Sequence, residues 1–227
     1  MQSDLLYLDK THEYFQLKGT EKKKLISVTE VLSGMGLIDM RGVPAELLAR
    51  AQKFGKALHY ATALDDVCKL DESTVKDTML RNHLESWRKF RKEWGYKFEE
   101  NEIEQIMYHP LFLFAGTPDR YKIMGQELHI IDLKTSTSMY PSTALQVGGY
   151  ELLICEILKR KFKKVIRLGV QTDDSGIAKV KEYKNPSDKS VFLSYLNTYK
   201  WELNNNIKRD WRHPARDTNQ ILGGITA

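Results

Sequence analysis

The stretch between residues 116 and 150 holds residue types that can hydrolyse a phosphate ester. Asp119 and Asp132 lie in two segments with the alternating pattern of neighbouring strands, and Lys134 follows Asp132 by two positions. Alternate residues of a strand share a face, so Asp132 and Lys134 project together. Two carboxylates, with backbone carbonyls and water, form an oxygen-ligand site suited to Mg²⁺ or Mn²⁺. The lysine beside them would orient or deprotonate an attacking water, or stabilise charge developing on a phosphate.

Two further polar residues follow on one face of a helix. Gln146 and Tyr150 are four positions apart, one turn from each other on a helix expected at 142–158. An Asp-x-Lys pair alone is a weak signal, because a surface ion pair on a strand has the same pattern. The apolar lead-in to Asp132 and the polar helix downstream favour a catalytic site instead.

The elements that must position these residues follow from periodicity and from start and stop signals. Helices are expected at 44–64, 73–94, 142–158 and 186–207, with a short helix capped by Ser27 or Thr29 and ended by Gly34 and Gly36. Strands are expected at 102–107, 117–123, 128–134, 165–172 and 177–183, after an N-terminal hairpin at 7–15. Hairpins interleaved with a crossover helix indicate an α/β fold with a mixed central β-sheet flanked by helices.

The length of 227 residues fits a single domain, 1–227, with one substantial core. Within it we expect four parts. They are an N-terminal hairpin and short helix (1–43), a helical wall (44–95), a catalytic core (96–185) and a C-terminal helix and tail (186–227).

The composition excludes several classes of protein. Hydrophobic residues make up 41% of the chain and charged residues 29%, with a net charge of +5, which excludes a disordered chain, a collagen-like repeat and a coiled coil. No apolar run reaches the roughly 18–20 residues that span a bilayer. Two cysteines are too few for a disulfide framework, so we expect a reducing, cytoplasmic setting. The positive charge permits nucleic-acid binding.

The motifs resemble those of the PD-(D/E)XK nucleases, and within them the RecB-like branch that includes phage exonucleases and the mitochondrial genome-maintenance exonuclease. Residues 118–119 (Pro-Asp) and 132–134 (Asp-Leu-Lys) match the motif that names the family, and residues 146–150 match the Gln-x-x-x-Tyr motif of the branch. The resemblance covers about 59–150, with the motifs in the family's order. It implies a restriction-endonuclease-like core with an N-terminal helical wall.

The resemblance also implies roles for single residues. Asp119 and Asp132 would be metal ligands together with the Leu133 carbonyl, and Lys134 would be the catalytic lysine. Gln146 and Tyr150 would hold the active site and the DNA backbone.

Further metal and DNA contacts follow in the same way. His59 matches an additional helical metal ligand, and Glu104 matches the acidic residue on the preceding strand, with Glu102 as the alternative for that position. The DNA contacts implied by the resemblance come from the following residues: Lys56, Arg120, Thr135, Gln146 and Tyr150. Relatives with an iron–sulfur cluster use four cysteines, so the resemblance with two cysteines implies no cluster.

The remaining histidines carry weaker signals. His129 alternates out of phase with Asp132, so we expect it to pack away from the metal. His12, His83 and His109 are expected in loops or on exposed faces.

The function implied is that of an Mg²⁺- or Mn²⁺-dependent DNA exonuclease in phage or bacterial DNA recombination, repair or replication. DNA is the expected partner, single-stranded or with double-stranded ends, with no membrane, and single-strand-annealing or replication proteins are candidate partners. A structure-specific or nicking endonuclease on the same core and a catalytically silent DNA-binding module are the alternatives. The helical wall and the N-terminal hairpin would guide a strand end into the site.

Overall fold

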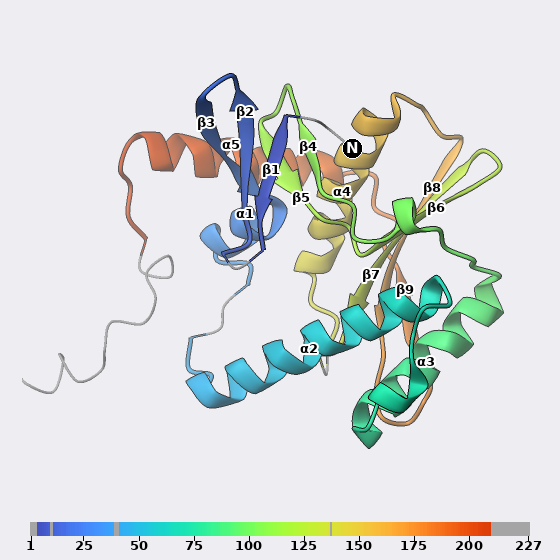
Figure 1. Ribbon diagram of the computed structural model, residues 1–227. Coiled ribbons are helices and arrows are strands. Elements are labelled where there is room, and N and C mark those ends of the chain that lie inside the picture. The colour runs from blue at the N-terminus through green and yellow to red at the C-terminus, as the bar shows by residue number, and fades with distance from the viewer. Residues whose placement is uncertain (1–3, 10, 39–40, 137, 210–227) are drawn as a thin grey trace, which may run out of the picture.

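The computed structural model describes residues 4–9, 11–38, 41–136 and 138–209 (Figure 1). The helices are α1 (Val28–Gly34), α2 (Ala45–Asp66), α3 (Thr78–Trp94), α4 (Ser142–Leu158) and α5 (Asp188–Asn204), with 3₁₀ turns η1 (Glu72–Thr74) and η2 (Glu100–Glu102). The strands are β1 (Leu5–Leu8), β2 (Glu13–Lys18), β3 (Glu21–Ser27), β4 (Met107–His109), β5 (Phe114–Gly116), β6 (Arg120–Met124), β7 (Glu127–Lys134), β8 (Lys164–Gln171) and β9 (Lys179–Glu182). The tail expected at the C-terminus lies outside the described residues.

These strands form two mixed sheets, which corrects the expectation of one central sheet. The first has the order β1-β2-β3-β5-β4, and the second has the order β6-β7-β8-β9. The break falls between β5 and β6, where Pro118 has no N–H to donate to a ladder. The chain is therefore an α/β protein in which the segments holding Asp119 and Asp132 lie at the junction of two sheets.

The two faces of strand β7 pack in two different hydrophobic cores. Leu128 and Ile130 pack in the same core as residues of α4, whereas Ile131 and Leu133 pack in the core that contains Leu58 of α2 and residues of α3. Because side chains alternate along a strand, Asp132 and Lys134 lie on the α4 side. The expected sharing of a face is confirmed by this register.

The helix signals are well reproduced. Ser27 accepts a hydrogen bond from the backbone N–H of Glu30 and forms a capping box that begins α1. Asp77 caps α3 through the N–H of Leu80, so α3 begins at Thr78 and not at the expected residue 73. Gly95, with a φ of 69°, ends the helix at the expected position.

Two segments differ from expectation. Residues 102–106 do not form the expected strand, since η2 occupies Glu100–Glu102, only an isolated bridge joins Ile103 to Arg120, and β4 begins at Met107. Residues 21–24, which are absent from the expected strands, form most of β3, because they pair with β2 and extend the N-terminal hairpin to three strands.

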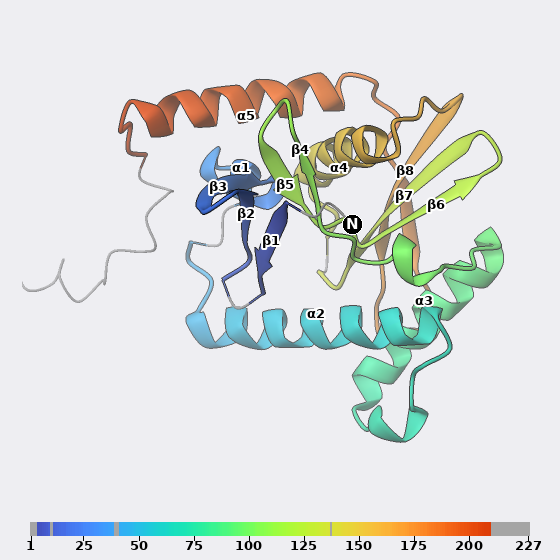
Figure 2. The same cartoon turned by 45° about the horizontal axis from the view of Figure 1, so that its top comes forward.

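The two views agree on the arrangement of the layers. Helix α5 lies along one side of the molecule and α2 along the opposite side, with both sheets between them (Figures 1 and 2). The first half of α2 lies below the N-terminal strands, and its second half reaches the second sheet (Figure 2). Within the described ranges, no helix combines the length and apolarity that crossing a bilayer requires.

Candidate active site

Asp132 is a buried carboxylate at the end of β7. It is 1% exposed, and neither of its carboxylate oxygens has a hydrogen-bond partner among the described residues. Lys134 Nζ lies 2.8 Å from Asp132 Oδ2 as an ion pair, without hydrogen-bond geometry. Burial raises the pKa of Asp132 to about 6, and the charge of Asp119 adds to this rise while Lys134 opposes it. A carboxylate in this setting is suited to a cation.

Asp119 comes from the segment that joins the two sheets. Its Oδ2 accepts a hydrogen bond of 2.7 Å from the backbone N–H of Leu133. This bond fixes the carboxylate against the end of β7, next to Asp132. The Leu133 side chain itself is in the core, 2% exposed.

His59 and Glu104 converge on Asp119 from two other elements. His59 Nδ1 of α2 lies 3.4 Å from Asp119 Oδ1 and 3.6 Å from Glu104 Oε1. The Glu104 backbone N–H donates to the Asp119 carbonyl at 3.0 Å, with a φ of 45° at Glu104. Burial disfavours the charged imidazole, but the two carboxylates outweigh it and raise the pKa of His59.

Glu102 does not belong to this group. Its carboxylate lies 2.7 Å from Lys122 Nζ, and it accepts from the Glu99 backbone N–H. The structure therefore places Glu104, and not Glu102, beside His59 and Asp119.

Gln146 and Tyr150 of α4 form a relay to the lysine. Lys134 Nζ donates to Gln146 Oε1 at 3.0 Å, and Gln146 Nε2 donates to the Tyr150 hydroxyl at 3.1 Å. Burial opposes the charge of Lys134, but Asp132 and Asp119 outweigh it and raise the pKa of the ammonium group. Burial raises the pKa of Tyr150 well above its usual value, so the phenol keeps its proton. Lys134 is thus held as an oriented cation.

The donor set can be tested against a divalent metal ion. Within the described ranges, no three His, Cys, Asp or Glu side chains already form a metal-binding group. The carboxylates of Asp119, Asp132 and Glu104 nevertheless supply the oxygen ligands that Mg²⁺ and Mn²⁺ prefer. The buried oxygens of Asp132 lack hydrogen-bond donors, which is the condition that a cation would relieve. The residues present fit such an ion.

Arg120 is not a DNA contact. Its side chain is fully buried, and its Nε lies 2.5 Å from Asp66 Oδ2 of α2. It also donates to Thr62 Oγ1 at 3.2 Å and to the Asp119 carbonyl at 2.6 Å, over the ring of Trp87. The guanidinium ties α2 to the strand that follows Asp119, because burial without these partners would be too costly. The sequence prediction for Arg120 is therefore wrong.

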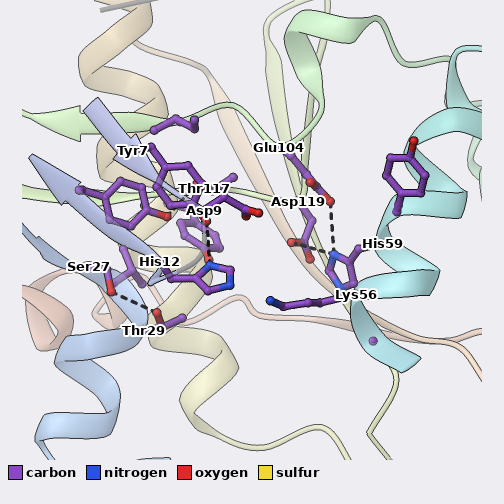
Figure 3. A pocket seen from close by; sticks show the side chains of 17 residues that line it. Tyr7, Asp9, His12, Ser27, Thr29, Lys56, His59, Glu104, Thr117 and Asp119 are labelled. Carbon is purple, nitrogen blue, oxygen red and sulfur yellow. Dashed lines mark hydrogen bonds and ion pairs between the residues drawn. The ribbon is translucent and has the colours of Figure 1, made fainter. Parts of the chain in front are cut away.

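Lys56 lies in the cavity beside the carboxylates, whereas Thr135 does not line it. The cavity has a volume of about 670 Å³ and lies between the N-terminal strands and α2 (Figure 3). Lys56 is exposed and extends from α2 into this space (Figure 3). Thr135 is half-buried after β7, where its Oγ1 lies 3.5 Å from the position that a Cβ would take at Gly55.

The far wall of the cavity consists of residues that sequence reasoning missed. They are Tyr7, Asp9, His12, Tyr14, Ser27, Thr29 and Thr117. Thr117 directly precedes the Pro118–Asp119 motif. No motif marked the others, since they approach the site only through the pairing of β3 with β5. Asp66 was also missed, although His59, Thr62 and Asp66 follow a helical spacing of three and four residues that places them on one face.

Comparison with known proteins gives no family for the chain. No family model matches it, and no curated protein is significantly similar to it.

Proposed function

We propose that this protein is a divalent-metal-dependent deoxyribonuclease of the PD-(D/E)XK type, acting as an exonuclease. The observation that carries the proposal is the buried Asp132. Its carboxylate oxygens accept no hydrogen bond from the described residues, and it lies beside the ammonium group of Lys134 and the carboxylate of Asp119. An ordinary structural ion pair has no need for a second carboxylate at this point.

The residues divide the work of phosphodiester hydrolysis. Asp119, Asp132 and Glu104 would hold Mg²⁺ or Mn²⁺, with His59 beside them. When bound, the ion supplies positive charge to the phosphate and a more acidic water. Lys134, kept cationic and aimed by Gln146, orients the attacking water and stabilises the negative charge that develops on the phosphate. Lys56 binds a phosphate of the strand at the cavity wall.

The restriction-endonuclease-like core is part of the same proposal. Support comes from β7 and β8, which pair in parallel through the crossover helix α4, with β6 antiparallel on the other side of β7. This unit brings Asp119, Asp132, Lys134 and the α4 relay to one end of the second sheet.

The direct test is a time course on linear DNA labelled at its 5′ or 3′ end, with Mg²⁺, Mn²⁺ or a chelator. We expect mononucleotides or short products from one end, and none with chelator. Asp132→Asn and Lys134→Met should each remove the activity, and Asp174→Asn, an exposed carboxylate in the β8–β9 turn, should keep it. Full activity of either site variant would contradict the proposal.

The exonuclease part has its own test. Closed circular single-stranded and double-stranded DNA should resist the protein, because neither has an end to enter the cavity. Rapid cleavage of either circle would instead identify an endonuclease on the same site.

A further inference from the structure

The cavity in front of Asp119 has one aromatic wall. The ring centroids of Tyr7 (β1) and Tyr14 (β2) are 4.8 Å apart with an interplanar angle of 35°, and the His12 ring lies 6.1 Å from that of Tyr7. All three side chains line the cavity, and Figure 3 shows Tyr7 and His12 on the side facing α2. We call Tyr7, His12 and Tyr14 the aromatic shelf.

His12 has an unusual backbone for a residue with a large side chain. Its φ is 51°, in the left-handed region of the β1–β2 turn, where glycine fits without strain. The imidazole is exposed, and its Nδ1 lies 2.7 Å from the Tyr7 hydroxyl. The turn thus places an imidazole ring at the cavity, although its backbone conformation favours glycine at this position.

The two walls differ in charge. Lys56 on α2 reaches across the cavity toward His12 (Figure 3), and within the described ranges no carboxylate forms an ion pair with it. Tyr60, 68% exposed, lines the cavity one helical turn further on. Asp9 lies on the wall of the aromatic shelf. Asp119 and Glu104 also line the cavity, beside His59 of α2, so Lys56 is the group that attracts a phosphate. Asp9 repels a phosphate from the hairpin wall, which leaves the shelf for an uncharged group.

We propose that the aromatic shelf binds a nucleobase of single-stranded DNA while Lys56 binds the adjoining phosphate. This inference rests on the proposed nuclease function and specifies its substrate: an unpaired strand. Aromatic side chains stack on any base without reading its sequence. In a duplex each base is stacked and paired, so its face reaches such a shelf only after unpairing.

The test is a binding experiment that needs no cleavage. A fluorescein-labelled oligothymidine is prepared as a series, each member with one abasic residue at a different position, and its affinity is measured by anisotropy in EDTA. In the wild-type protein we expect one or two abasic positions to weaken binding by about 10-fold, the size of one lost base stack. A blunt duplex of the same length should bind more weakly than the single strand.

Two shelf variants and two controls complete the experiment. His12→Gly removes the ring and relieves the backbone, so the fold is retained, and Tyr7→Ala removes the second ring. Both should bind the intact strand about 10-fold more weakly and lose the dependence on abasic position. Tyr7→Phe keeps a ring and should keep the position dependence. Trp201→Ala, which removes an exposed ring on α5, should match the wild type.

The proposal is overturned by a flat abasic profile in the wild type, by an unchanged profile in His12→Gly and Tyr7→Ala, or by equal affinity for the blunt duplex. Its failure is distinct from failure of the nuclease function. DNA cleavage in Mg²⁺ together with a flat abasic profile would refute base binding by the aromatic shelf and leave the nuclease proposal standing. An abasic profile that depends on position, without cleavage in Mg²⁺ or Mn²⁺, would support base binding by the shelf and refute the nuclease function.

Discussion

Lys134 depends on two side chains of α4 for its position. Gln146 accepts from Lys134, and Tyr150 accepts from Gln146, so the relay acts on the reaction only through the lysine. We predict that Gln146→Ala lowers kcat by about 10- to 100-fold, as loss of a supporting hydrogen bond does at metal sites, with little change in KM. Tyr150→Phe should have a smaller effect, because the Gln146–Lys134 bond remains. Steady-state kinetics on a labelled single strand measures both.

The same kinetic measurement can contradict the positioning role of Gln146. If Gln146 touched the DNA backbone instead, Gln146→Ala would raise KM and leave kcat unchanged. Gln146 is 8% exposed and Tyr150 4% exposed, which favours the positioning role.

Arg120 supports a second prediction, about stability. Its guanidinium and the Asp66 carboxylate are both fully buried, and Trp87 Nε1 also donates to Asp66, at 2.8 Å. Arg120→Met should lower the free energy of unfolding by about 3–5 kcal/mol, because it leaves a buried carboxylate without its main counter-charge. Urea unfolding followed by tryptophan fluorescence measures the loss.

A surface pair provides the control. Lys69 and Glu100 form an ion pair with side chains 60% and 70% exposed. Lys69→Met should cost no more than about 1 kcal/mol. Equal effects of Lys69→Met and Arg120→Met would show that the buried pair contributes nothing special.

Single residues could be predicted where local sequence determines them. Asp132 and Lys134 share a face because of strand alternation, and Gln146 and Tyr150 because of the helical turn. Arg120 could not be placed correctly, since its burial depends on Asp66, more than fifty positions away along the chain. A single sequence contains no local signal that separates a buried arginine from one that faces DNA.

His83 links α3 to the end of β8, and it gives stability a pH dependence. Its Nδ1 lies 2.9 Å from Thr172 Oγ1, and burial lowers its pKa from the usual 6.5, while Asp173 and Asp174 oppose this. Between the lowered value and 6.5 the unfolded chain binds more protons than the folded one. The contribution of His83 to stability is therefore present above pH 6.5 and is lost as pH falls through this window.

The prediction is a comparison of slopes. Between about pH 7.5 and about pH 5.5, the melting temperature of the wild type should fall further than that of His83→Asn. The reason is that asparagine retains a polar group near Thr172 but does not titrate. Circular dichroism melts at each pH measure this difference. A steeper slope in His83→Asn would contradict the assignment.

Whole elements were predictable in proportion to the strength of their local signals. The helix at 142–158 has the expected bounds, α1 begins at the expected cap Ser27, and α3 ends as expected but begins at Thr78 instead of residue 73. The strand expected at 102–107 is wrong up to residue 106, where the chain forms the end of a 3₁₀ turn and a single bridge before β4 begins at Met107. His83 and His109, expected in loops or on exposed faces, are buried, 6% and 7% exposed, by contacts with distant elements.

The division into two sheets is a property of the whole molecule that local patterns did not contain. The parallel pairing of β3 with β5 joins segments almost ninety residues apart and brings the N-terminal hairpin to the candidate active site. The hairpin itself could be predicted from the sequence, but the contact of Tyr7 and His12 with the cavity arises only from this pairing.

The net charge of +5 says nothing of where DNA would bind until the basic residues are located on the folded chain. Lys56 lines the cavity of the candidate active site, whereas Lys161 lines a different cavity between α4 and α5, beside His109 and Cys155. If DNA follows the first cavity, binding constants should fall linearly with salt on logarithmic axes, by about 0.7 per phosphate contact for a single strand.

Lys56→Gln should therefore flatten this salt dependence by about one phosphate contact and weaken binding to all sequences alike, since a phosphate contact reads no base. Lys161→Gln changes the net charge by the same amount and should leave the slope unchanged. Anisotropy titrations of an oligothymidine in EDTA over a range of NaCl concentrations compare the two variants. An equal flattening by both would mean that the strand responds to total charge and not to the path beside Asp119. A flattening by Lys161→Gln alone would move the DNA to the second cavity, away from Asp119.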